Sequence, residues 1–128
     1  MKVFSNSNYN ADFIFDELMT GSGVVVIEDV YHMNVIHSAK EIINNLADTQ
    51  GQKESHFNAE AEAKGKINLQ QRVWNLFGKD PIFSKIISHD IIFELMSNFL
   101  GTEFTCGSYC ASRLLPGSPG QELHLDYP

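Results

Sequence analysis

The sequence predicts a mixed fold of helices and strands, of the α+β class, in a single domain spanning residues 1–128. Two kinds of apolar spacing lead to this prediction. Apolar side chains recur every three or four residues over 33–48 and again over 91–100, which is the period of a helix with one buried face. The run Val24–Ile27 and the alternating stretch 121–127 lack that period and are typical of strands. A chain of this length can bury a substantial core.

The first predicted helix covers about 11–20. Residues 1–9 are expected to be a polar lead-in, and Asn10 or Asp12 can cap the helix N-terminus. Gly21-Ser22-Gly23 is expected to end it. Its predicted apolar side consists of Phe13, Ile14, Leu18 and Met19.

A strand and a longer helix follow. The β-branched run Val24–Ile27, between glycine and two acidic residues, predicts a buried strand. The helix over about 33–48 presents an apolar stripe on one side. His32 and His37 lie about 140° apart around that helix, so they do not form a metal-binding pair. Both histidines are expected to face solvent.

The middle of the chain is predicted as a loop followed by two short helices. Residues 49–66 are polar and contain two glycines, which indicates a loop, and 72–77 are either a short strand or irregular. Asp80-Pro81 is a helix start, with an N-cap residue followed by proline. Ser88-His89-Asp90 is expected to end that helix and cap the next, which Gly101 stops.

The last quarter of the chain changes to a period of two. Residues 104–115 predict one strand or two short ones, and 116–120 predict a turn from their proline and glycine content. In the final predicted strand, Glu122, His124 and Asp126 share one face, because side chains two apart point the same way.

The composition argues against several classes of partner. The net charge is −7 and the nine basic residues are scattered, so no nucleic-acid partner is expected. No apolar run reaches the roughly 18 residues that span a bilayer, and the N-terminus lacks a signal-peptide core. We therefore expect no membrane partner and a cytoplasmic location. Cys106 and Cys110, roughly 13 Å apart along a strand, are too distant for a disulfide and are expected to be reduced, buried packing residues.

The pair His124-x-Asp126 is the strongest candidate for chemistry. An imidazole and a carboxylate on one strand face can supply two of the three ligands of a 2-His-1-carboxylate iron site. Five histidines and 16 acidic residues in 128 produce such a spacing by chance about as often as not. The residues alone therefore leave two alternatives, a metal site and an ordinary surface pair.

The stretch from 66 to the end resembles the phytanoyl-CoA dioxygenase family of Fe(II)- and 2-oxoglutarate-dependent oxygenases. The resemblance rests on Arg72–Phe77, Asp80–Phe83, Ile87–Asp90, Leu100-Gly101 and the segment PGSPGQELHLDYP. The Gly-x-x-x-Gln-x-x-His-x-Asp arrangement within this last segment is moderately specific, and the helical spacing before it raises the match above chance. The earlier part of the chain, a strand followed by a helix, matches the family more loosely.

This resemblance implies a fold, two cofactors and a set of site residues. The expected fold has N-terminal helices packed on part of a double-stranded β-helix, or jelly roll, which is truncated here. The expected iron ligands are His124 and Asp126, with no other catalytic residue, and Gln121 and Arg72 are expected to contact 2-oxoglutarate. Since a carboxylate is present at Asp126, the resemblance implies a hydroxylase acting on a small molecule, and not a halogenase.

The family's second iron-binding histidine and its basic 2-oxoglutarate anchor are expected beyond Pro128. We therefore expect this chain alone to bind metal weakly and to be inactive. Unpaired strand edges would favour self-association into a homo-oligomer. The alternative interpretation is a non-catalytic α/β interaction domain with an incidental His-x-Asp.

Overall fold

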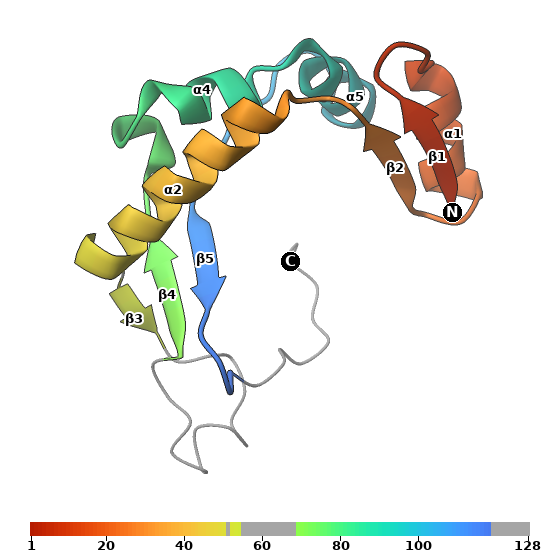
Figure 1. Cartoon of the computed structure of the whole chain (residues 1–128). Helices are drawn as coiled ribbons and strands as arrows, with labels where there is room; N and C mark the ends of the chain where they lie inside the picture. Colours follow the sequence, from red (N-terminus) through yellow and green to blue (C-terminus); the bar gives the residue numbers. More distant parts are fainter. Residues whose placement is uncertain (51, 55–68, 119–128) are drawn as a thin grey trace. The chain divides into compact units, whose positions relative to one another are not determined.

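The computed structural model is a mixed helix and strand structure, which confirms the α+β prediction at that level. The structure describes residues 1–50, 52–54 and 69–118. Figure 1 shows the chain coloured from its N-terminus to its C-terminus. The chain divides into two compact units. The first unit combines Met1–Ala39 with Phe77–Gly107, and the second combines Lys40–Leu76 with Ser108–Pro128. The single domain predicted over 1–128 stays a prediction.

The first unit begins with a small parallel sheet. Strand β1 (Lys2–Ser5) pairs with β2 (Val25–Glu28), and helix α1 (Ala11–Thr20) connects them (Figure 1). The polar lead-in predicted over 1–9 is therefore wrong, because Val3 and Phe4 find their strand partners only in β2.

Strand β2 is buried on one face only. Its residues alternate between half-buried and exposed, and Val24 just before it is 52% exposed. The prediction of a fully buried strand over Val24–Ile27 is wrong, because this sheet has two strands and α1 packs on one side of it. The Phe4 and Phe13 rings, with centroids 6.2 Å apart, mark that contact.

Helix α1 follows its prediction at both ends. The Asn10 side chain accepts a hydrogen bond from the Phe13 amide at 2.8 Å, and the Gly21 amide donates to the Glu17 carbonyl. Ile14 is fully buried, whereas Phe13 and Met19, expected on the apolar side, are exposed. The buried face is therefore centred on Ile14 and not on those two residues.

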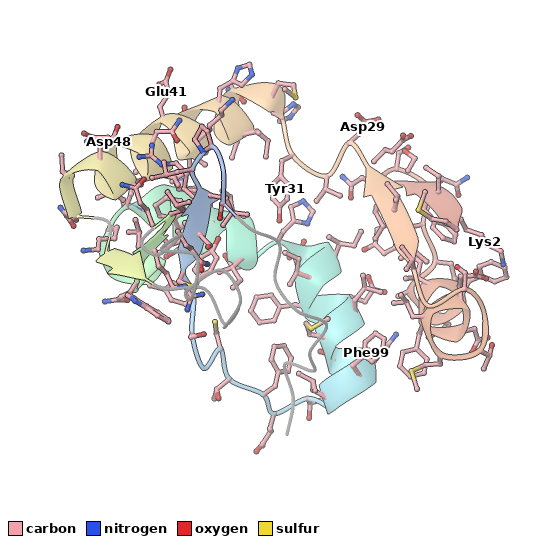
Figure 2. All side chains as sticks on the ribbon, turned by 90° about the horizontal axis from the view of Figure 1, so that it is seen from below. Lys2, Asp29, Tyr31, Glu41, Asp48 and Phe99 are labelled. Atoms are coloured by element: carbon pink, nitrogen blue, oxygen red, sulfur yellow. The ribbon has the colours of Figure 1, made fainter. Side chains whose placement is uncertain are left out.

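Two further helices lie entirely in the first unit, α4 (Pro81–Ile87) and α5 (Asp90–Leu100). Asp80 and His89 are their N-caps, as predicted, and His89 Nδ1 accepts from the Ile91 amide at 3.3 Å. Tyr31, labelled in Figure 2, donates its hydroxyl to the Ile86 carbonyl at 2.6 Å and packs its ring edge-on against His89. Helix α5 also packs against α1, where the Phe99 and Phe15 ring centroids lie 4.8 Å apart.

The second unit contains an antiparallel sheet in the order β3-β4-β5. Its strands are β3 (Gln52–Glu54), β4 (Gln70–Val73) and β5 (Ala111–Leu114), and Figure 1 shows β4 between the other two. The end of the long helix α2 (Met33–Gln50) lies in this unit, and a 3-10 turn (Leu76–Gly78) follows β4.

This sheet corrects two expectations. Residues 52–54, predicted within a loop, pair with β4, and of the predicted strand 104–115 only Ala111–Leu114 joins a sheet. Cys106 is exposed and Cys110 half-buried, with no disulfide between them, so burial of Cys106 was wrongly predicted. Within the described residues, no helix is long and apolar enough to cross a membrane.

Candidate functional site

Strands β4 and β5 have two chemically distinct faces. Gln71 is the register partner of Arg113, and Arg72 is the partner of Ser112. Because side chains alternate along a strand, Gln71 and Arg113 lie on one face, and Arg72, Ser112 and Gln70 lie on the other. The first face is covered by helix α2, and the second is the candidate site.

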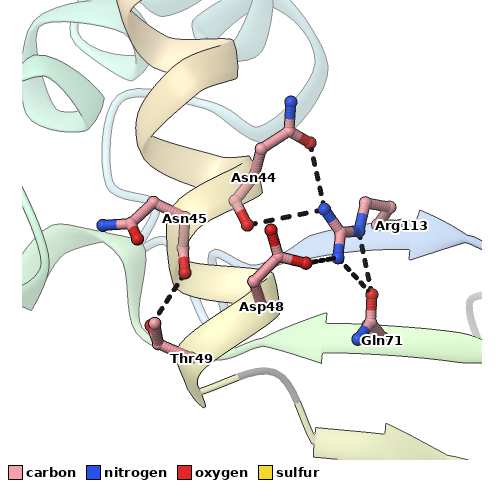
Figure 3. Close-up of polar contacts among 6 residues, drawn as sticks. All are labelled: Asn44, Asn45, Asp48, Thr49, Gln71 and Arg113. Atoms are coloured by element: carbon pink, nitrogen blue, oxygen red, sulfur yellow. Dashed lines mark hydrogen bonds and ion pairs between the residues drawn. The ribbon is translucent and has the colours of Figure 1, made fainter.

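The face toward α2 is held by the guanidinium of Arg113 (Figure 3). Its Nε and Nη2 atoms donate to Gln71 Oε1 at 2.8 and 2.6 Å, and Nη2 also pairs with the carboxylate of Asp48. Nη1 makes longer contacts of 3.4 Å with the carbonyl and side-chain oxygens of Asn44. One side chain thus links both strands to the helix, a structural role.

The polar groups on the opposite face differ in their exposure to water, and Ser112 is exposed. Gln70 is only 4% exposed, and its Nε2 donates to the hydroxyl of Ser112. Arg72 is half-buried and lies directly opposite Ser112 in the register, and its guanidinium carbon lies 5.0 Å from the centre of the Trp74 ring. A buried polar group costs free energy unless it is bonded, and Gln70 meets this requirement through Ser112.

This arrangement suits a carboxylate-bearing ligand. A guanidinium offers a planar pair of donors that matches a carboxylate, and stacking on Trp74 limits the orientations that Arg72 can adopt. Gln70 fixes Ser112 beside it, and a serine hydroxyl can both donate and accept. The sequence singled out Arg72 but missed Gln70 and Ser112. Gln70 lies two residues before Arg72 on β4, and Ser112 lies opposite Arg72 on β5. This grouping follows from the β4–β5 register, which the sequence alone does not give.

A tight turn leads out of β5. The Leu115 amide donates to the Leu69 carbonyl at 2.8 Å, which extends the β4–β5 ladder, and the Ser118 amide donates back to the Leu115 carbonyl at 3.0 Å. Residues 115–118 form a type II turn, with Pro116 second and Gly117 third. The third residue of such a turn requires a positive φ, and Gly117 has φ of +83°. The predicted turn is therefore confirmed as far as Ser118.

The other predicted site residues, Gln121, His124 and Asp126, lie outside the described residues. Their roles stay predictions. Within the described ranges, no group of three or more His, Cys, Asp or Glu side chains could hold a metal ion. His32 and His37 are exposed on or next to α2, as expected.

Comparisons with models of protein families, with curated proteins and with solved structures found no match to this chain.

Proposed function

We propose that this chain is an Fe(II)- and 2-oxoglutarate-dependent dioxygenase related to the phytanoyl-CoA dioxygenases, acting as a hydroxylase on a small molecule. The observation that carries the proposal is the half-buried Arg72, which lies on a polar sheet face with Gln70 and Ser112. In the sequence, β5 of that strand pair is followed, after the turn at 115–118, by the Gln121–Asp126 segment. In this proposal the β3-β4-β5 sheet is part of a double-stranded β-helix.

The donor set of the proposed iron site fits ferrous iron. An imidazole from His124 and a carboxylate from Asp126 are two of the three ligands in the 2-His-1-carboxylate set, which needs one further histidine. When bound, iron together with 2-oxoglutarate and O₂ would supply the oxidation of a C–H bond. The protein residues supply binding and orientation.

Each polar residue on the sheet face has a defined task in this proposal. Arg72 binds a carboxylate of 2-oxoglutarate through its guanidinium, and Trp74 holds that guanidinium in place. Gln70 orients the Ser112 hydroxyl, and Gln121 contributes a further contact to the same ligand. The proposed role of Arg72 therefore depends on the ligand's charge and not on the metal.

Metal binding is tested by titrating the full chain with Mn(II), a redox-stable probe, in a calorimeter. His124→Ala and Asp126→Ala should each weaken the affinity at least tenfold, because each removes a direct ligand. His37→Ala is the matched control, since His37 is exposed on α2. Unchanged affinity in both ligand variants would favour the non-catalytic interaction domain.

The 2-oxoglutarate site is tested separately through Trp74, the chain's single tryptophan. Binding next to Arg72 should change its fluorescence, and Arg72→Gln should lower the 2-oxoglutarate affinity at least tenfold while leaving Mn(II) affinity unchanged. Lys85→Gln, a change of an exposed cation in the first unit, should have no effect. Equal affinity in Arg72→Gln and the parent chain would remove Arg72 from the site.

A further inference from the structure

An apolar cavity of about 400 Å³ opens in the first unit, between α4, α5 and the segment after α5. The described residues that line it all fall within Phe77–Gly107, in one compact unit. Aromatic walls come from Phe77, Phe93 and Phe104, and aliphatic walls from Ile92, Met96 and Leu100. The volume lies within the roughly 300–1,000 Å³ typical of small-molecule sites.

The lining has almost no polar character. The exceptions are the hydroxyls of Ser84, Ser88 and Thr105 and the thiol of Cys106, and no charged side chain is found among the lining residues that the structure describes. The Ser88 hydroxyl already donates to the Ser84 carbonyl at 2.5 Å. A charged ligand group placed here would lose hydration without gaining a counter-charge, so the cavity favours an uncharged ligand.

The mouth of the cavity leaves large apolar side chains in contact with solvent. Phe93 is 50% exposed, and Phe77 and Leu100 are also exposed. The Phe93 and Phe104 rings lie 5.9 Å apart and tilted, which gives two ring surfaces on neighbouring walls. Contiguous exposed apolar surface around a concave site is typical of ligand-binding grooves, and filling the cavity would cover these side chains.

We propose that this cavity binds a small, uncharged, apolar molecule. Its affinity comes from burial of the ligand against the phenylalanine and aliphatic walls, and a hydroxyl such as Thr105 offers a single polar contact. This inference is independent of the proposed dioxygenase activity. Its described lining residues belong to the first unit, and none of them lies on the β4–β5 face.

The probe for this site is N-phenyl-1-naphthylamine, an uncharged aromatic fluorophore, titrated into the full chain. We expect saturable binding with one site per chain. Phe93→Ala removes one wall and should weaken binding roughly tenfold, since it deletes a large apolar contact. The matched control is Phe13→Ala, because Phe13 is 51% exposed on helix α1 and does not line the cavity. Absence of saturable binding, or equal weakening in both variants, overturns the proposal.

Two further measurements test the cavity without altering its walls. Decanol should displace the fluorophore, whereas decanoate at the same concentration should not. Equal displacement by both would refute the proposal that the cavity selects uncharged ligands. Bound fluorophore should also slow alkylation of Cys106, which lines the cavity, and leave the rate at Cys110, which does not, unchanged. No protection at Cys106 would place the bound fluorophore elsewhere and refute the assignment.

Discussion

Replacing Arg113 by alanine should destabilise the second unit by about 2–3 kcal/mol. The largest part comes from Gln71, which is only 8% exposed and accepts two hydrogen bonds from Arg113. An acceptor left buried without its donors costs about 1–3 kcal/mol. Asp48 is 66% exposed, so its ion pair with Arg113 contributes less than about 1 kcal/mol. The Asn44 contacts, at 3.4 Å, add little.

The assay is urea unfolding followed by the fluorescence of Trp74, which lies directly after β4. A lower midpoint with an unchanged slope gives the change in free energy of unfolding. Asp48→Asn is the matched control, because it removes the charge pair and keeps the side-chain shape. It should cost less than about 1 kcal/mol.

A double replacement separates the buried hydrogen bonds from the packing of the same side chains. Gln71→Leu and Arg113→Leu should each destabilise, and together they should lose less than the sum, because both halves of the polar pair are then removed. The reasoning is refuted if Arg113→Ala costs no more than Asp48→Asn. Strict additivity of the two leucine variants would also contradict it.

Three other predictions follow from single residues. Lys2, bonded to the carboxylate of Glu17 at 2.7 Å, is the main cause that lowers the pKa of Glu17 from 4.5 to about 2. This stabilisation is complete above pH 4.5 and disappears as the pH falls through about 2, so Glu17→Gln should flatten acid unfolding over that window, and identical acid profiles would contradict it. Gly101→Ala should lower the free energy of unfolding, measured by thermal unfolding, by about 1–3 kcal/mol, because Gly101 has φ of +83°. Gly107 has no positive φ, so Gly107→Ala should be tolerated. Steric clashes do not distinguish the two positions, because among the described residues no atom lies within 4 Å of a Cβ added at either one. Asn75 has φ of +56°, so Asn75→Ala should lower stability by about 1 kcal/mol and Asn75→Gly should not, and equal melting temperatures for the two variants would count against this.

The helices could be predicted because their ends are encoded locally. Asn10, Asp80 and His89 each accept a hydrogen bond from an amide two or three residues ahead, and Gly101 adopts a backbone conformation that only glycine reaches easily. These signals need no tertiary partner. The predicted bounds of α1 and the capping of α4 and α5 are accordingly confirmed.

The short strands could not be predicted because their partners are distant. Lys2–Ser5 becomes a strand by pairing with Val25–Glu28, and Gln52–Glu54 by pairing with β4. Three or four residues are too few for a period-two pattern to stand out, and the second of these segments is entirely polar. In both cases the sequence contains no local strand signal, because the strand forms only through backbone hydrogen bonds to a distant partner strand.

Strand β4 shows why only part of the candidate site was visible in the sequence. Gln70 and Gln71 are identical in chemistry and adjacent, so periodicity cannot assign them different roles. Alternation in β4 sends Gln71 toward α2, where it receives two hydrogen bonds from Arg113, and sends Gln70 to the face of Arg72, where it bonds to Ser112. Which glutamine stabilises the fold and which lies in the candidate site depends on where α2 packs. The position of α2 is a tertiary property. Through the register of β5 with β4, it also decides which residues of β5 lie on the same face as Arg72.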